Sequence, residues 1–155
     1  MFNDTIRRMP RPQDVCGMST QEIRDAFLIS NLFVPGKLTG TFTDLDRLVV
    51  GGVMPTEKSV ELPNHKETGR VYFLERREMG VINVGGSGRI VADGQTFALE
   101  KLDCVYLPMG TKTVAFSSGD PKNPAKFYFL SCPAHAPYPM RLMKSAEAAP
   151  ATAGA

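Results

Sequence analysis

The stretch MGVINVGGSGRIVADGQTFAL, residues 79–99, decides the fold class. Asp93-Gly94 separates two β-rich runs and is the strongest hairpin signal in the chain, because Asp-Gly readily forms the tight turn that joins antiparallel strands. The cluster Gly85-Gly86-Ser87-Gly88 predicts a second hairpin turn, with positive φ at several positions. It lacks the GxxxxGK[ST] pattern of a phosphate loop, and no helix signal follows it.

Similar runs predict roughly ten short strands along the chain, separated by turn signals about every 8 to 12 residues. They cover residues 32–34, 38–43, 47–54, 58–62, 70–76, 79–84, 89–92, 95–99, 103–107, 113–116 and 126–130. This spacing predicts an all-β, mainly antiparallel sandwich or barrel. Ser19 and Glu22 form a capping-box pattern that predicts one short helix, ending near Ile29 and burying Ile23, Ala26 and Phe27.

We predict three parts along the chain. Residues 1–18 form an arm without periodicity, residues 19–144 form the barrel domain, and residues 145–155 form a linker or disordered tail. The tail, SAEAAPATAGA, has too little apolar surface to order itself.

Composition excludes several functions. The 155 residues carry a net charge of +2, with basic and acidic residues scattered along the chain, so we expect no nucleic-acid partner. No apolar run approaches the roughly 20 residues of a membrane span, and the start lacks the apolar stretch of a secretory signal, so we expect a cytoplasmic protein. Cys16, Cys104 and Cys132 are too few and too far apart for a disulfide framework or a zinc knuckle; for Cys104 we predict a buried, inert thiol.

Two further stretches resemble the motifs of the cupin barrel, or jelly roll. Glu78 and Gly85 have the glutamate-to-glycine spacing of the first cupin motif. Pro108-Met109-Gly110 supplies the PxG of the second motif, after Asp103. Proline and glycine at such places turn the chain at the corners of a narrow barrel.

The metal ligands of the cupin motifs are missing. Tyr72 and Leu74 stand where the first motif has two histidines, and Thr113 stands where the second has one. His65 and His135 are the only histidines in the chain, so a three-histidine site cannot be built. We predict a barrel whose metal seat is vacant.

Longer stretches carry a more specific resemblance. LDRLVVGGVMP (45–55), VYFLERREMGVINVGGSG (71–88), DGQTF (93–97) and NPAKFYFLSCPAHAPYP (123–139) resemble the amino-terminal domain of 5-keto-4-deoxyuronate isomerase, also named 5-dehydro-4-deoxy-D-glucuronate isomerase. The similarity covers about residues 19 to 143.

The resemblance implies a zinc-dependent, hexameric enzyme of pectin breakdown with two cupin domains in tandem. It isomerises 4-deoxy-5-ketouronate to 3-deoxy-D-glycero-2,5-hexodiulosonate, an aldose–ketose interconversion. The zinc ligands belong to the carboxy-terminal domain, so the resemblance assigns no metal ligand to this chain. The chain is then a fragment, one half of a split enzyme, or a protein that has lost its second half.

Candidate substrate-binding residues follow from the resemblance to a uronate enzyme. Arg76 or Arg77 could bind a carboxylate through the two donors of a guanidinium. In a strand they point to opposite faces, so at most one faces the barrel interior, and Tyr72, Leu74, Arg76 and Glu78 share one face. Glu78 is a candidate general base, or the partner of Arg76. The alternative is that residues 75–78, Glu-Arg-Arg-Glu, form structural ion pairs.

His135 and Tyr138 lie in a proline-bounded segment that could present them to a neighbouring site. The alternative is a hydrogen-bonded surface histidine beside a packed tyrosine. His65 lies in a polar stretch, and we expect it to be solvated. No catalytic residue can be assigned from the sequence.

Two functions remain. The chain is the metal-free half of the isomerase, with a uronate substrate and the carboxy-terminal cupin half as partner, or it is a stand-alone cupin that binds a sugar acid or assembles an oligomer. A polar interior around Arg76 and Glu78 would favour binding, whereas apolar filling would favour a scaffold. A metal-dependent dioxygenase or germin-like cupin is disfavoured by the missing histidines.

Overall fold

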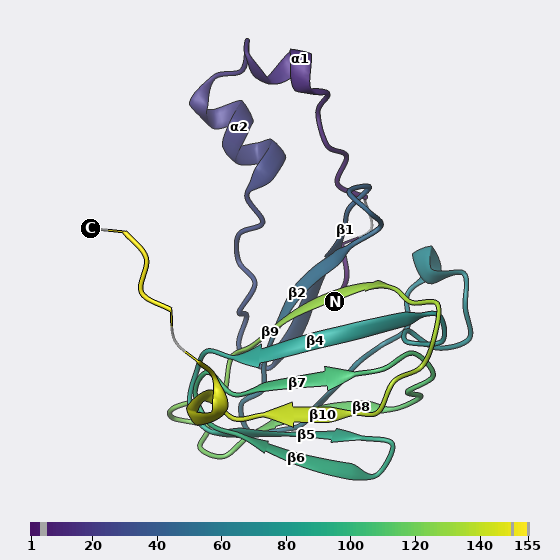
Figure 1. The fold of residues 1–155 in the computed structure, drawn as a ribbon, viewed down its shortest axis with the longest axis vertical. Helices are drawn as coiled ribbons and strands as arrows, with labels where there is room; N and C mark the ends of the chain where they lie inside the picture. Colours follow the sequence, from purple (N-terminus) through teal and green to yellow (C-terminus); the bar gives the residue numbers. More distant parts are fainter. Residues whose placement is uncertain (4–5, 150, 155) are drawn as a thin grey trace.

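In the computed structural model, which describes residues 1–3, 6–149 and 151–154, two antiparallel sheets face each other (Figure 1). The strands are β1 (Lys37–Phe42), β2 (Val49–Met54), β3 (Val60–Glu61), β4 (Arg77–Asn83), β5 (Gly88–Ala92), β6 (Gln95–Leu99), β7 (Cys104–Leu107), β8 (Val114–Ser118), β9 (Phe127–Pro133) and β10 (Arg141–Met143). The helices are α1 (Pro12–Val15) and α2 (Thr20–Phe27), with 3-10 turns η1 (Lys66–Thr68) and η2 (Ser145–Glu147). The predicted mainly antiparallel β architecture is confirmed.

Strand β9 lies near the centre of the larger sheet, whose order is β1-β2-β9-β4-β7-β10. It pairs with β2 on one side, where Ser131 faces Val49, and with β4 on the other, where Pro133 faces Arg77. The smaller sheet has the order β3-β8-β5-β6. A strand from late in the chain therefore joins the β1–β2 hairpin to the rest of the larger sheet.

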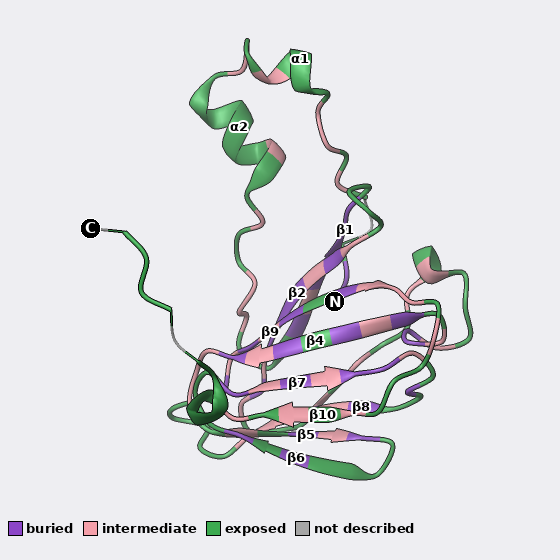
Figure 2. Cartoon of the chain, in the orientation of Figure 1, coloured by how far each residue is buried: buried purple, intermediate pink, exposed green. Residues whose placement is uncertain are grey.

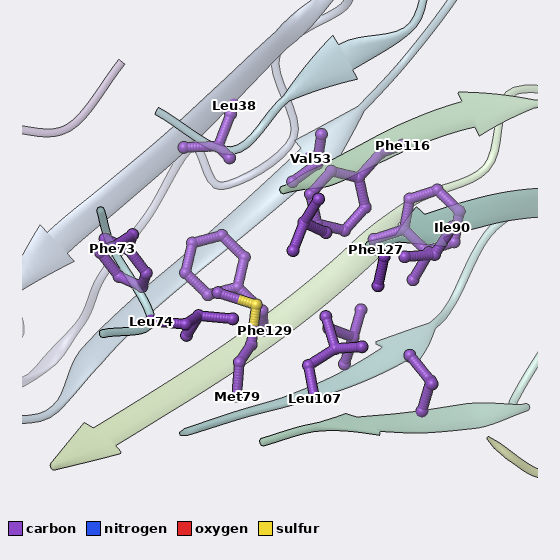
Figure 3. Packing of buried hydrophobic residues seen from close by; sticks show 14 of the residues in the cluster. Leu38, Val53, Phe73, Leu74, Met79, Ile90, Leu107, Phe116, Phe127 and Phe129 are labelled. Carbon is purple, nitrogen blue, oxygen red and sulfur yellow. The ribbon is translucent and has the colours of Figure 1, made fainter. Parts of the chain in front are cut away.

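The space between the sheets is filled by apolar side chains (Figure 3). Strand β4 shows the alternation that creates this core, because Met79 and Val81 are buried between Glu78, Gly80 and Ile82. The largest fully buried apolar side chains are Phe116, Phe127, Phe129, Leu74, Met79, Ile90, Leu99, Leu107, Val49, Val53 and Val105. The side chains between the two sheets are therefore mostly apolar.

The predicted strands differ from the structure at three places. Residues 32–34 form no strand, and residues 70–76 form bends and a turn, so that β4 begins only at Arg77. Strand β10 was not predicted, because its three residues are too few to show an alternation. It pairs with β7 through Leu142 and Val105 and extends the edge of the larger sheet.

The glycine cluster at residues 85–88 is not a hairpin turn, and none of its glycines has a positive φ. It connects β4 in the larger sheet to β5 in the smaller one. A Cβ atom on Gly85 would lie 2.5 Å from the backbone nitrogen of Lys126, and one on Gly88 would lie 2.8 Å from the carbonyl oxygen of Ser117. Glycine is needed here because two backbones approach closely at a barrel corner. Asp93-Gly94, by contrast, joins β5 to β6 as predicted.

Helix α2 stands away from the barrel (Figure 1), and its side chains are mostly exposed (Figure 2). The predicted capping box between Ser19 and Glu22 is present. The predicted burial of Ile23 and Phe27 is wrong, since they are 39% and 50% exposed. Ala26 is only partly buried. In the described part of the chain, no helix has the length and apolar character to span a membrane.

Arg7 connects the end of α2 to the end of β1. Its guanidinium donates to the carbonyl oxygens of Asp25 at 2.9 Å and Leu28 at 2.7 Å, while its backbone nitrogen donates to Phe42 at the end of β1. A cation at a helix carboxyl end is electrostatically favourable. The division at residues 18 and 144 stays a prediction; residues 4–5, 150 and 155, which fall in the predicted arm and tail, lie outside the described residues.

Asp103 fixes the carboxyl end of the barrel. Its buried carboxylate accepts hydrogen bonds, each 2.8 Å long, from Lys144 Nζ and from the backbone N–H groups of Ser145 and Glu100. Burial raises the pKa of Asp103, but these hydrogen bonds outweigh it and hold the pKa below its ordinary value. Asp103 thus holds the chain after β10 against the start of β7.

We predict that Asp103→Asn lowers the free energy of unfolding by about 2 kcal/mol at pH 7, because hydrogen bonds to a charged carboxylate are lost. Because the pKa of Asp103 is lower in the folded than in the unfolded protein, its carboxylate stabilises the folded state fully at pH values above the unfolded-state pKa of about 3.9. This stabilisation is lost as the pH falls through the pKa of the folded state. The difference from wild type should therefore shrink below about pH 4. Urea unfolding at several pH values measures this.

The matched control is Glu57→Gln, which removes an exposed carboxylate that makes no hydrogen bond within the described residues. It should leave the unfolding free energy unchanged. Equal stability of Asp103→Asn and wild type at pH 7 would contradict the role given to Asp103.

Candidate functional site

A cleft of about 330 Å³ lies at one end of the barrel and is lined by four arginines: Arg47, Arg70, Arg76 and Arg77. We call it the arginine cleft. Arg47 belongs to the β1–β2 turn, Arg70 follows η1, and the other two stand where β4 begins. Glu67 is the only carboxylate among the lining residues. The lining of the cleft therefore carries more positive than negative charge.

Arg77 forms the floor of the arginine cleft and is only 8% exposed. Its Nε donates to Ser131 Oγ at 3.1 Å, and its Nη2 donates to the carbonyl oxygens of Ser131 at 2.8 Å and Arg47 at 2.7 Å. Its guanidinium carbon lies 6.0 and 5.9 Å from the ring centres of Phe42 and Phe73. Burial lowers the pKa of Arg77, and the neighbouring charge of Arg47 lowers it further; Arg77 remains a cation at neutral pH.

Aromatic rings form the wall beside Arg77. Phe2 stacks on Phe73 with ring centres 5.1 Å apart, and the His65 ring stacks on Phe42 at 5.0 Å. The expectation that His65 is solvated is wrong: it is half-buried, because it packs on this cluster, and its Nδ1 accepts from the backbone of Glu67.

The positions of a cupin metal seat do not fit a metal. Leu74 is fully buried in the apolar core, Tyr72 is half-buried, and Thr113 is exposed. Among the described residues, no group of three or more histidine, cysteine, aspartate or glutamate side chains could hold a metal ion. Zinc, which the resemblance assigns to the complete enzyme, has no fitting set of ligands here.

A second polar cluster lies on the outer face of the larger sheet. The phenol of Tyr106 donates to Glu78 Oε2 at 2.7 Å, and Cys132 Sγ lies 3.6 Å from Glu78 Oε1. Tyr138 and Arg141 join Glu78 and Tyr106 in lining a shallow hollow of about 740 Å³. A neighbouring apolar hollow of about 500 Å³ continues over Gly80, Ile82 and Leu130.

These contacts favour the protonated forms of three groups. Burial, together with Glu78 as acceptor and neighbouring charge, raises the pKa of Tyr106 to about 12. Burial and Glu78 raise the pKa of Cys132, while burial and Asp103 raise that of Cys104. Thiols with raised pKa values are poor nucleophiles at neutral pH. Cys104 is half-buried rather than buried as predicted, whereas its raised pKa agrees with the predicted inert thiol.

The candidate residues predicted from the sequence line two different places in the structure or neither of them. Arg76 lines the arginine cleft, whereas Glu78 and Tyr138 line the outer-face hollow. The predicted partnership of Glu78 with Arg76 is wrong, because Glu78 is held by Tyr106. Tyr138 is 54% exposed rather than packed. Tyr72 and His135 line neither place, and His135 is exposed.

Sequence reasoning missed Arg47, Arg70 and Tyr106. The first two come from turns with no motif, and Tyr106 is placed by the register of β7 against β4. The inward direction of Arg77 could have been found, because alternation carried back from Met79 and Val81 places Arg77 on the core side.

The antiparallel two-sheet barrel is a cupin fold. An IolB-like protein of Salmonella typhimurium has a similar structure, with a TM-score of 0.50 and 18% identity over 64% of this chain and 37% of the other. Residues 37–155 match the KduI/IolB family, and the chain belongs to that family.

Its curated relatives are named 4-deoxy-L-threo-5-hexosulose-uronate ketol-isomerase. The one from Caldicellulosiruptor bescii is 47% identical over 86% of this chain and 49% of its own length. The one from Lacticaseibacillus paracasei is 45% identical over 95% of this chain and 52% of its own length. This identity confirms the family resemblance. The chain spans about half the length of these ketol-isomerases.

We predict that Glu78→Gln lowers the pKa of Tyr106 from about 12 toward 10, because the variant removes the carboxylate charge beside the phenol. Titration of ¹³C-labelled tyrosine by NMR measures this, with Tyr106→Phe to assign the signal. Because the pKa of Tyr106 is higher in the folded than in the unfolded protein, its contribution to stability is complete only below the unfolded-state pKa of about 10. The wild-type protein should therefore lose this stability between about pH 10 and 12.

Glu61→Gln is the control, since Glu61 is exposed on β3 in the smaller sheet. It should leave the titration of Tyr106 unchanged. A Tyr106 signal that titrates near pH 10 in the wild-type protein would contradict the hydrogen bond.

Proposed function

We propose that this chain is the metal-free, amino-terminal half of a 5-dehydro-4-deoxy-D-glucuronate isomerase. The observation that carries the proposal is identity of 45–47% to ketol-isomerases over nearly this whole chain but only half of theirs. The substrate in this proposal is a 4-deoxy-5-ketouronate from pectin breakdown, and the partner is a carboxy-terminal cupin half. A homohexamer in the cytoplasm, which the sequence also led us to expect, belongs to the same proposal.

The reaction moves one proton between neighbouring carbon atoms and one between their oxygens, with no net change in composition. It needs a base placed beside the carbon that loses its proton. The interior of this barrel is lined mostly by apolar side chains, which offer a charged uronate few polar partners. The contribution of this half is therefore to stabilise the assembly and to present its outer surfaces, while the second half carries zinc and the chemistry.

A second candidate is a stand-alone cupin that binds a sugar acid. The apolar interior speaks against a site inside the barrel, in line with the scaffold alternative. The arginine cleft favours binding at the rim instead, because guanidinium groups recognise carboxylates. Contact with a substrate stays a prediction for five residues: Tyr72, Arg76, Glu78, His135 and Tyr138.

The proposal predicts that the isolated 16.9 kDa chain has no isomerase turnover and no stoichiometric zinc. Co-expression with the carboxy-terminal half of the Lacticaseibacillus paracasei relative should give a complex that contains zinc and converts the uronate to the 2,5-diketo acid. Intact mass, metal analysis and turnover are measured on one purified sample. The carboxy-terminal half expressed alone is the control.

Co-purification with zinc and an activity above that of the control would support the proposal. If the two halves do not associate and this chain purifies alone and inactive, the proposal is contradicted and the stand-alone cupin is favoured. Turnover by the isolated chain would contradict the assignment of catalysis to the second half.

A further inference from the structure

The arginine cleft concentrates positive charge that the described residues leave uncompensated. Arg47, Arg70 and Arg76 are exposed, and their side chains make no hydrogen bond or ion pair within the described part of the chain. Glu67 alone lines the cleft with the opposite charge. Like charges gathered from three separate segments repel one another, and an anion placed among them would relieve this repulsion.

Arg77 gives the cleft a fixed donor. Its Nε and Nη2 atoms bond only neutral partners, the hydroxyl of Ser131 and two carbonyl oxygens. Its remaining nitrogen, Nη1, makes no hydrogen bond within the described residues. No buried side-chain nitrogen there lacks a partner, so Nη1 must reach solvent. Because Arg77 lines the cleft, we infer that Nη1 contacts the solvent inside the cleft.

The packing around Arg77 prepares this donor for a ligand. Three hydrogen bonds and the rings of Phe42 and Phe73 hold the guanidinium in place before anything binds. A buried cation with only neutral partners has lost hydration that these partners replace incompletely. A bound anion would regain that energy without the entropy cost of ordering Arg77.

Size and lining restrict what the cleft can take. About 330 Å³ lies at the low end of the range for small-molecule sites. Ile6, Phe42 and Pro133 add apolar surface beside the arginines, and Thr43 and Thr68 add hydroxyl groups. This lining suits a small polar molecule with one anionic group, held by guanidinium donors, with its carbon skeleton on the apolar wall.

We propose that the arginine cleft is a binding site for a small molecule that carries an oxyanion, either a carboxylate or a phosphate, on a polar carbon skeleton. Arg77 binds the oxyanion through Nη1, and Arg76 and Arg70 close over it from the rim. The lining of the cleft includes none of the three cupin metal positions, Tyr72, Leu74 and Thr113, and shares no residue with the outer-face hollow. It requires neither zinc nor isomerase activity, so it does not rest on the proposed isomerase half; it deepens the second candidate function, which is binding of a sugar acid at the rim of the barrel.

The test titrates the isolated chain, by calorimetry and by NMR, with D-galacturonate, glucose 6-phosphate and inorganic phosphate. Galactose, which has the galacturonate skeleton without its charge, is the neutral control ligand. At least one anion should bind, and its affinity should fall as the salt concentration rises. Binding of galacturonate identifies a sugar acid as the source of the oxyanion, and binding of either phosphate compound alone identifies a phosphate.

Variants at the rim keep the test free of folding defects. Arg70→Gln and Arg76→Gln together remove two exposed guanidiniums and should weaken anion binding at least tenfold. Arg89→Gln is the matched control, because Arg89 is an exposed arginine on β5 in the opposite sheet. Equal thermal unfolding midpoints would show that all variants are folded.

Three results would overturn the proposal. One is the absence of binding by all three anions. Another is equally tight binding of galactose. The third is a double variant, Arg70→Gln with Arg76→Gln, that binds the anion as tightly as the control variant Arg89→Gln.

Discussion

The buried guanidinium of Arg77 ties together three parts of the chain at the open end of the barrel. Through Ser131 it joins β4 to β9, and through the carbonyl oxygen of Arg47 it holds the β1–β2 turn over the same point. The rings of Phe42 and Phe73 lie beside it and belong to the aromatic cluster that includes His65. The shape of the arginine cleft depends on this one side chain, because Arg77 lines the cleft and contacts two other lining residues, Arg47 and Phe42.

Much of the fold could be predicted from local patterns, since strand alternation and Asp93-Gly94 are local signals. The pattern failed at the start of β4. A predicted strand over residues 70–76 put Arg76 and Glu78 on one face, whereas the strand begins at Arg77 and Arg77 points inward. Arg76 lies in the bend before the strand and is exposed, whereas the alternation that buries Met79 and Val81 also buries Arg77.

The candidate site was less predictable, because its parts come from segments that are far apart in sequence. Arg47 and Arg70 lie in turns, and Tyr106 meets Glu78 only through the pairing of β7 with β4. Helix α2 shows a different failure. Its capping box correctly marks where the helix begins, but capping is local and says nothing of what the helix packs against. Apolar residues such as Phe27 can therefore remain exposed.

The location of β9 between β2 and β4 has a consequence for synthesis of the chain. The hairpin β1–β2 and the pair β4–β7 can form from residues made early, but neither can join the other until residues 127–133 have left the ribosome. Such late, distant pairing slows folding. Until then, the edges of β2 and β4 have no partner strand and can pair with other chains. The nascent chain is thus most exposed to aggregation just before its central strand arrives.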